Sequence, residues 1–196
     1  MQISDKSALI VVDVQGGDMT GGWLTSSDNT DTAAGAHRAS LPYVKRVLDV
    51  FRAKKLPVIQ LKEVHRKEMV DFGRELDGSE GVHLLDSSPY TDYNHLTYPI
   101  DGEYTITKRR YSGFFGTDLE ILLKGLKVDT LYLVGGFTDV CVHYTAVDAH
   151  QHDYRVRVVT DAVSGSGWDA HHAALKAIGY LQRDALITTA DVEAAL

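Results

Sequence analysis

The sequence predicts an α/β fold, a doubly wound three-layer α/β/α arrangement around a mostly parallel sheet of about six strands. Two observations predict it. Short β-branched apolar runs alternate along the chain with longer amphipathic stretches, which is the pattern of βαβ units. The first run, residues 8–14, is apolar almost throughout, as expected of a parallel strand that helices cover on both faces.

The expected elements follow in order along the chain. The apolar runs place strands at residues 8–14, 57–64, 104–108, 130–135, 155–160 and 185–189. The amphipathic stretches place helices at residues 32–55, 118–124, 139–152 and 168–181. The first helix has the clearest helical periodicity, with an apolar stripe formed by Leu41, Val44, Val47, Leu48 and Phe51.

The length of 196 residues, with 44% hydrophobic content, suits one well-buried core, so we expect a single domain over residues 1–196. One stretch, at about residues 65–102, is too long for a passive connection in such a domain. We expect it to be a lid or an interface loop. Because it carries apolar side chains that need cover, we also expect a homodimer or homotetramer; these side chains are Leu84, Leu85, Tyr90, Tyr93 and Leu96.

Charge and composition restrict the partners. With 20 Lys plus Arg against 27 Asp plus Glu, the net charge of −7 argues against a nucleic-acid partner, which needs a basic face. No apolar stretch approaches the ~18 residues that span a bilayer, so no membrane partner is expected. The opening residues lack the apolar core of a secretory signal, and a single cysteine suits a reducing compartment. The expected location is therefore cytoplasmic.

Three reactive side chains stand where predicted strands end. Asp13 closes the first strand, Lys108 closes the third, and Cys141 follows the fourth at the start of a helical segment. Taken singly, each has a structural alternative: a turn-forming aspartate, a lysine of a solvated basic face and an inert buried thiol. Together they are better explained as one site, because the carboxyl ends of parallel strands meet in the crevice where such sheets bind ligands.

The three residue types also suit one chemistry. A thiol at a helix N-terminus is expected to have a lowered pKa, and the same backbone N–H groups can hold an oxyanion. Asp13 can accept the thiol proton, and Lys108 can stabilise both anions. His143 is not a candidate base, because residues i and i+2 do not face one another on a helix.

Three ordered segments resemble the isochorismatase-like cysteine hydrolases across nearly the whole chain: VVDVQ, TKRRYSGFFGTDL and GGFTDVCVHYTAVDAHQHDYRVRVVTDAVSG. The resemblance implies that Asp13, Lys108 and Cys141 form a catalytic triad. It further implies a non-proline cis peptide between Gly136 and Phe137, which would direct the Phe137 N–H toward an oxyanion.

Retention of the cysteine favours the amidase branches of that superfamily over the vinyl-ether-cleaving branch. The expected function is a cysteine-dependent amidohydrolase that cleaves a C–N bond of a small amide or ureide through a thioester, without a cofactor. Two alternatives stay open. One is a metal-dependent, nicotinamidase-like enzyme, and the other is a catalytically idle scaffold of the same fold.

The metal question concerns Glu63, His65 and His83. They stand where the nicotinamidase-like branch has an acid, a histidine and a later histidine that bind a metal, and both residue types are possible ligands. The segment EVHR, however, also resembles ureide-cleaving members that need no metal. We favour direct substrate binding by Glu63 and His65, with Gln182 supplying a further amide contact, because His83 lies in a Gly-rich segment that need not return to the other two.

Two further expectations concern side chains away from this set. Asp18 stands where the superfamily often has phenylalanine, so Trp23 is a candidate to replace that aromatic wall. The helical histidines are expected at the surface; they are His150, His152, His171 and His172.

Overall fold

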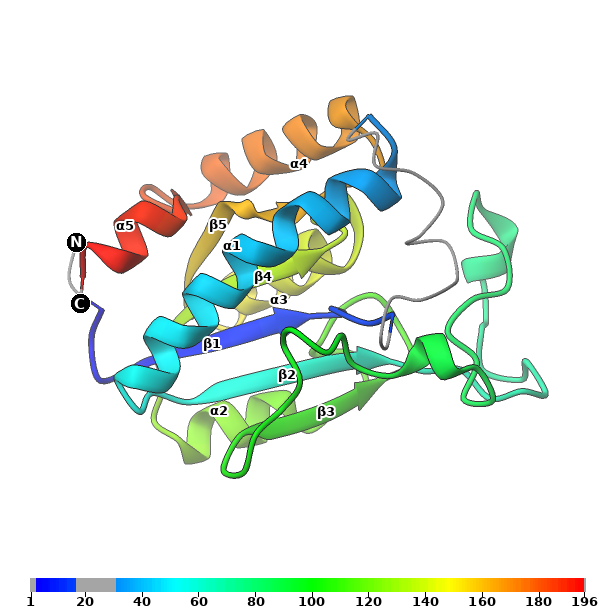
Figure 1. The fold of residues 1–196 in the computed structure, drawn as a ribbon, viewed down its shortest axis with the longest axis horizontal. Coiled ribbons are helices and arrows are strands. Elements are labelled where there is room, and N and C mark those ends of the chain that lie inside the picture. The colour runs from blue at the N-terminus through cyan, green and yellow to red at the C-terminus, as the bar shows by residue number, and fades with distance from the viewer. Residues whose placement is uncertain (1–2, 17–30, 196) are drawn as a thin grey trace.

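The structure, a computed structural model, describes residues 3–16 and 31–195. Its centre is a parallel sheet of six strands in the order β3-β2-β1-β4-β5-β6; Figure 1 labels the strands β1 to β5 of this sheet. The strands are β1 (Ser7–Val12), β2 (Val58–Glu63), β3 (Tyr104–Lys108), β4 (Thr130–Gly136), β5 (Arg155–Ser164) and β6 (Leu186–Ile187). The predicted fold class, a doubly wound sheet with helices on both faces, is confirmed.

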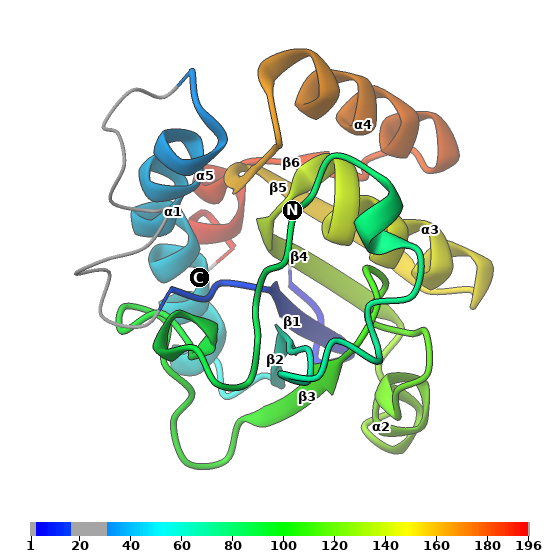
Figure 2. The ribbon, with the colours of Figure 1, turned by 90° about the vertical axis from the view of Figure 1, so that its right-hand side faces the viewer.

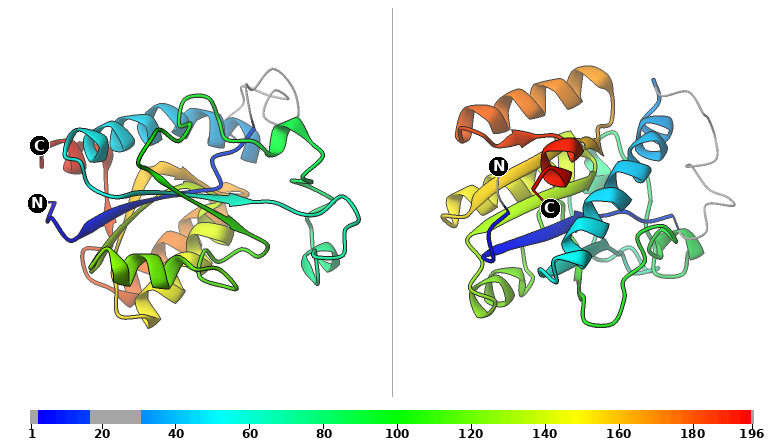
Figure 3. Two further views of the ribbon diagram at one scale, coloured as in Figure 1. Left: turned by 90° about the horizontal axis from the view of Figure 1, so that it is seen from below. Right: turned by 60° about the vertical axis from the view of Figure 1, so that its left-hand side comes forward.

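Helices cover both faces of the sheet, as the view from below in Figure 3 makes clear. One face packs against α1 (Ala33–Ala53) and α5 (Thr189–Glu193), and the other against α2 (Leu119–Gly125), α3 (His143–Gln151) and α4 (Trp168–Leu181). Side chains of β1 alternate between the two cores: Ile10 and Val12 join one, Leu9 and Val11 the other. This double burial is why the strand has no polar face.

Two of the differences from the expected elements have a clear physical cause. β5 runs to Ser164, past the polar Thr160 and Asp161, because an irregularity in its pairing with β4 lets the strand continue beyond a bulge. α5 was not expected; the side chains of Thr188 and Asp191 form a capping box that starts it within the expected last strand.

The segment between β2 and β3 extends beyond the carboxyl ends of the strands, on the right of Figure 1 and toward the viewer in Figure 2. It contains two short helical turns, η2 (Glu75–Asp77) and η3 (Pro89–Thr91). Within this segment, Tyr93 is buried by residues of the same chain, whereas Tyr90 is 39% exposed. The homodimer or homotetramer therefore stays a prediction. Among the described residues, none of the helices combines the length and apolarity needed to cross a bilayer.

Gly135 shows how closely β1 and β4 approach. It pairs with Val12 at a backbone φ of +109°, and an added Cβ would overlap the Val12 carbonyl oxygen. We predict that Gly135→Ala lowers the free energy of unfolding by about 3 kcal/mol or more, from backbone strain and overpacking together. Urea denaturation measures this change.

The matched control is Gly125→Ala in α2, where an added Cβ meets open space. This variant should be unchanged or more stable by up to about 1 kcal/mol, because alanine is the better helix former. Equal unfolding free energies for Gly135→Ala and the wild type would contradict the close approach of the strands.

Candidate active site

The chain order of the strands reverses between β1 and β4, and the carboxyl ends on either side of this point carry the candidate residues. Figure 2 looks onto this edge. Asp13, Glu63 and Cys141 line a cavity of about 570 Å³ there, and Lys108 is buried beneath them. The structure thus brings together the three residues predicted from the strand ends, with Glu63 as a fourth.

Lys108 is the centre of the cluster. Its Nζ lies 2.7 Å from Asp13 Oδ2 and 3.5 Å from Cys141 Sγ, and it forms an ion pair with Glu63. The Arg110 carbonyl oxygen, at 3.0 Å, accepts a further hydrogen bond. Burial lowers the pKa of Lys108, but its anionic neighbours outweigh burial and raise that pKa. The side chain is therefore a permanent buried cation.

The backbone at Asp13 turns its carboxylate toward this cation. Asp13 follows the last residue of β1 and has a positive φ of 50°, a conformation that aspartate adopts more readily than most residues. Burial, opposed by the charge of Lys108, raises the pKa of Asp13 to about 6. A carboxylate with this pKa is mostly ionised at neutral pH, yet can hold a proton at little cost.

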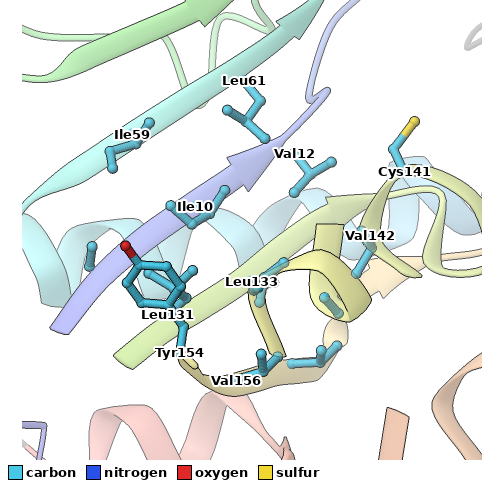
Figure 4. Close-up of a cluster of buried hydrophobic side chains, with 14 of the residues drawn as sticks. Ile10, Val12, Ile59, Leu61, Leu131, Leu133, Cys141, Val142, Tyr154 and Val156 are labelled. Atoms are coloured by element: carbon cyan, nitrogen blue, oxygen red, sulfur yellow. The ribbon is translucent and has the colours of Figure 1, made fainter. Parts of the chain in front are cut away.

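Cys141 lies on η4 (Thr138–Val142), a single π-helical turn that precedes α3. Figure 4 shows its sulfur directed away from the apolar cluster that includes Val12 and Val142. Burial raises the pKa of the thiol, and Asp13 and Glu63 raise it further, against the lowering effect of Lys108. The expected lowering of this pKa by a helix N-terminus is therefore wrong, because burial beside two carboxylates outweighs it.

Strand pairing brings Glu63 to the same place. Glu63 ends β2 in register with Lys108 of β3, and its Oε2 lies 3.6 Å from Cys141 Sγ. The Gln15 side chain bonds both backbone groups of Glu63, accepting from its N–H at 3.0 Å and donating to its carbonyl at 2.9 Å. Burial raises the pKa of Glu63, but Lys108 and two histidines bring it well below the ordinary value, so Glu63 stays ionised.

His65 does not line the cavity. It is fully buried behind Glu63, with its ring stacked on Phe72 at 3.9 Å between centroids. Its Nε2 lies 3.2 Å from an oxygen of Glu63 and 3.2 Å from one of Glu75. Burial lowers the pKa of His65, but these two carboxylates raise it to about 9. The expectation that His65 binds substrate is corrected: this side chain holds Glu63 from behind.

His83 does return to Glu63, contrary to the expectation. Its Nε2 lies 3.1 Å from Glu63 Oε1, and its Nδ1 lies 2.7 Å from the carbonyl oxygen of Gly81. The Gly-rich segment is thus folded back over the carboxyl ends of the strands. Against the effect of burial, the same carboxylate raises the pKa of His83.

Gln182 lies at the other end of the sheet. It follows α4, and its side chain bonds both the N–H and the carbonyl of Val156, the second residue of β5. Because all strands run parallel, this position is opposite the edge that carries Cys141. The expected substrate contact of Gln182 is therefore corrected, and the residue joins a helix end to a strand start.

The backbone between β4 and η4 passes beside the cavity. The peptide bond between Gly136 and Phe137 is cis, and both residues line the cavity. Their role toward an oxyanion stays a prediction.

His171 is buried, with its Nδ1 2.8 Å from Thr138 Oγ1, so its expected surface position is wrong. The aromatic-wall candidates Asp18 and Trp23 lie outside the described residues.

Sequence reasoning missed four residues of the site. Gln15 belongs to the VVDVQ motif, and its spacing two residues after Asp13 was the available signal. His37 on α1 lines the cavity, with its Nδ1 3.1 Å from Ser164 Oγ. Tyr111 donates to Glu80 at 3.0 Å, and both line the cavity. No local pattern marks His37 or Glu80, because only the tertiary fold brings them here.

Comparison with known proteins agrees with this geometry. The isochorismatase domain model matches residues 7–191. The chain belongs to the isochorismatase family. It is 42% identical over 78 residues to the uncharacterized isochorismatase family protein YwoC of Bacillus subtilis, a match that covers 40% of this chain and 41% of YwoC.

Two further relatives extend the family comparison. Ureidoacrylate amidohydrolase RutB of Yersinia enterocolitica is 31% identical over 192 residues, covering 88% of this chain and 81% of RutB. The crystal structure of pyrazinamidase of Pyrococcus horikoshii in complex with zinc is similar at a TM-score of 0.76 and 28% identity, covering 93% of this chain and 98% of the other. Both are similar to this isochorismatase-family chain along most of its length.

The variant Lys108→Met tests the effect of the cation on the thiol. In Lys108→Met, Asp13 and Glu63 remain beside the thiol without the cation, so the pKa of Cys141 should rise further. Alkylation by iodoacetamide should need a pH higher by at least one unit, or about 1.4 kcal/mol. Lys124→Met, at an exposed pair on α2, is the control and should not shift. If the pH dependence of alkylation does not shift in Lys108→Met, Lys108 does not control the pKa of the Cys141 thiol.

The pH dependence of turnover tests the role of Asp13. If ionised Asp13 accepts the thiol proton, kcat/KM should fall as pH drops through about 6, where Asp13 becomes protonated. Glu63→Gln removes a negative charge that raises the pKa of Asp13, so this acid limb should move to lower pH. A wild-type limb at the ordinary aspartate value, or an upward movement in Glu63→Gln, would contradict the assignment.

Proposed function

We propose that this chain is a cysteine-dependent amidohydrolase that cleaves a C–N bond of a small amide or ureide through a thioester. One observation supports the proposal most directly: a buried ammonium, Lys108, lies 2.7 Å from the Asp13 carboxylate and 3.5 Å from the Cys141 sulfur beside a cavity. A base, a cation and a nucleophile are then within contact distance of the space that a substrate would fill.

The first half of the reaction forms the thioester. Because the pKa of the Cys141 thiol is raised, the resting enzyme holds a neutral thiol beside an ionised Asp13. As the sulfur attacks the substrate carbonyl, Asp13 takes its proton, and the carbonyl oxygen becomes an oxyanion. Backbone N–H groups of Phe137 and Cys141 are the proposed donors to that oxyanion. Asp13 then gives the proton to the departing nitrogen, so ammonia or an amine leaves.

The second half releases the acid. Asp13, ionised again, takes a proton from water, and the resulting hydroxide attacks the thioester carbonyl. The C–S bond breaks, and the proton returns from Asp13 to the sulfur. Lys108 stays charged in every step, which limits the growth of negative charge at the sulfur. Glu63 stays ionised and moves no proton; its role is to hold Lys108 in place.

A metal-dependent, nicotinamidase-like hydrolase is the second candidate, because four possible ligands converge beside the cavity. Ligand atoms of Glu63, His65, Glu75 and His83 all lie within 4.8 Å of one another, and nitrogen and carboxylate donors fit zinc. These residues would hold the ion, which would supply a Lewis acid. Against this reading, both histidines direct Nε2 at the same oxygen of Glu63, so a metal ion would have to displace the imidazole protons that the Glu63 carboxylate stabilises.

Chelation separates the two candidates. We predict that activity survives prolonged treatment with EDTA and that metal analysis of the purified protein finds substoichiometric metal. Nicotinamide is included as a substrate, because its hydrolysis only in the presence of added zinc or manganese would favour the second candidate. Loss of turnover on chelation with recovery on zinc addition would reject the metal-free enzyme.

The decisive test of the hydrolase is a panel of small primary amides and ureides, assayed for ammonia release. Cys141→Ser and Asp13→Asn should each lower kcat at least about a thousandfold, because one removes the thiol and the other the proton acceptor. Cys141→Ser should keep the wild-type unfolding midpoint, since the change is nearly isosteric, whereas Asp13→Asn leaves the buried Lys108 with one carboxylate partner and should lower the midpoint. Ammonia release by Cys141→Ser at the wild-type rate would reject the thioester, and no release by the wild type from any compound would favour the idle scaffold.

A further inference from the structure

We propose that the cavity selects a small amide or ureide whose non-reacting end is neutral or positively charged, and that it rejects one carrying a carboxylate. This inference rests on the proposed function, because it concerns the substrate of the same site. It follows from the charges that line the cavity and from the way in which each nearby cation is already bound.

Three carboxylates are among the side chains that line the cavity. Asp13 and Glu63 form the floor with Cys141, and Glu80 of the segment between β2 and β3 lines the same space. Glu80 accepts a hydrogen bond of 3.0 Å from the Tyr111 hydroxyl, so its position on the wall is held by a residue that also lines the cavity. A substrate carboxylate would lose its water in a space bordered by three groups of like charge.

Lys108 has no donor left for a substrate anion. An ammonium has three N–H groups, and those of Lys108 are accounted for by Asp13, Glu63 and the carbonyl oxygen of Arg110. Its side chain is also fully buried, beneath the residues that line the cavity. All three N–H groups of the cation are therefore engaged within the protein, and none is available to a substrate carboxylate.

The two histidines of the lining do not supply a cationic donor either. Both ring nitrogens of His83 are in use, Nε2 with Glu63 at 3.1 Å and Nδ1 with the Gly81 carbonyl at 2.7 Å. His37 carries no charge at neutral pH, because burial lowers its pKa to about 4. Of the described side chains that line the cavity, three are carboxylates, Asp13, Glu63 and Glu80, and none is a lysine or an arginine.

Three arginines that follow strand-end residues of the site bind elsewhere. Arg109 donates to the Val64 carbonyl oxygen, Arg110 to that of Asp71, and Arg66 pairs with the Asp71 carboxylate at 2.8 Å. Among the described residues, none of these guanidinium groups lines the cavity. In sequence, residues 17–30 contain two aspartates and no lysine, arginine or histidine.

The aromatic part of the lining suits the same class of substrate. Tyr90, Tyr111 and Phe137 border the cavity, and aromatic rings attract cations while accommodating neutral planar amides. The similar amidohydrolase of Yersinia enterocolitica is named for ureidoacrylate, a compound with a carboxylate. The carboxylates that line the cavity of this chain suit a substrate that carries no carboxylate of its own.

The test uses two series of compounds that differ mainly in the charge of one end. The ureas are N-carbamoylglycine, N-carbamoylglycinamide and (2-aminoethyl)urea, and the amides are succinamate, succinamide and 4-aminobutanamide. Ammonia release by the wild type gives kcat/KM, and calorimetry with Cys141→Ser gives Kd without turnover. In each series that binds, we expect the neutral or the cationic member to have a kcat/KM about tenfold or more higher, and a Kd about tenfold or more lower, than the anionic member.

The outcomes separate this inference from the proposed function. Equal or better binding of the anionic members overturns the inference, and so does failure of all six compounds to bind Cys141→Ser. Binding in the expected order without ammonia release from the wild type overturns the hydrolase instead and leaves the charge selection standing.

A pair of variants tests the assignment to Glu80. Glu80→Gln should reduce the discrimination against the anionic members severalfold, because it removes one carboxylate and keeps the shape of the side chain. Glu68→Gln is the control, since Glu68 lies exposed in the same segment and does not line the cavity; it should leave the ratio unchanged. Unchanged discrimination in Glu80→Gln would overturn the part assigned to this residue.

Discussion

The buried ammonium of Lys108 is the interaction on which the site depends. A lysine charge without water is tolerated only when opposite charges and acceptors surround it. Asp13 and Glu63 meet that need from the ends of two neighbouring strands, and the Arg110 carbonyl completes the set. The parallel pairing of β1, β2 and β3 is therefore as much a part of the site as the side chains, because it sets the spacing at which one cation reaches both anions.

Glu63 links this cluster to the long segment that covers it. One of its oxygens faces Lys108 and Cys141, while the other receives His65 and His83. The Glu63 carboxylate thus contacts both the side chains proposed to react and the histidines of the segment between β2 and β3. Gln15 adds a second connection, since its side chain bonds Glu63 and also the Thr91 carbonyl of η3.

Much of the arrangement could be predicted from sequence, because strand ends in a parallel sheet converge. Asp13, Lys108 and Cys141 were placed in one crevice by that rule alone, and Glu63 ends the strand between two of them. What failed depended on contacts distant in sequence. Gln182 was assigned by resemblance, yet its position after α4 takes it to the opposite edge.

The remaining errors have the same origin. Whether the pKa of Cys141 is raised or lowered depends on burial and on two carboxylates. The residues next to Cys141 at the start of the helical segment do not indicate either. His65 was expected to bind substrate, but β2 ends at Glu63 and the imidazole of His65 is fully buried. Neither effect has a signal within a few residues of the side chain concerned.

Burial of the ion pairs has a further consequence, for the influence of dissolved salt. Exposed charges are screened over a Debye length of about 8 Å at physiological ionic strength, whereas buried pairs are screened much less. Lys108, Asp13 and Glu63 are all shielded from solvent, with side chains at most 8% exposed. The balance between them is set by the protein interior, so the electrostatic environment of Cys141 should stay nearly constant from dilute buffer to concentrated salt.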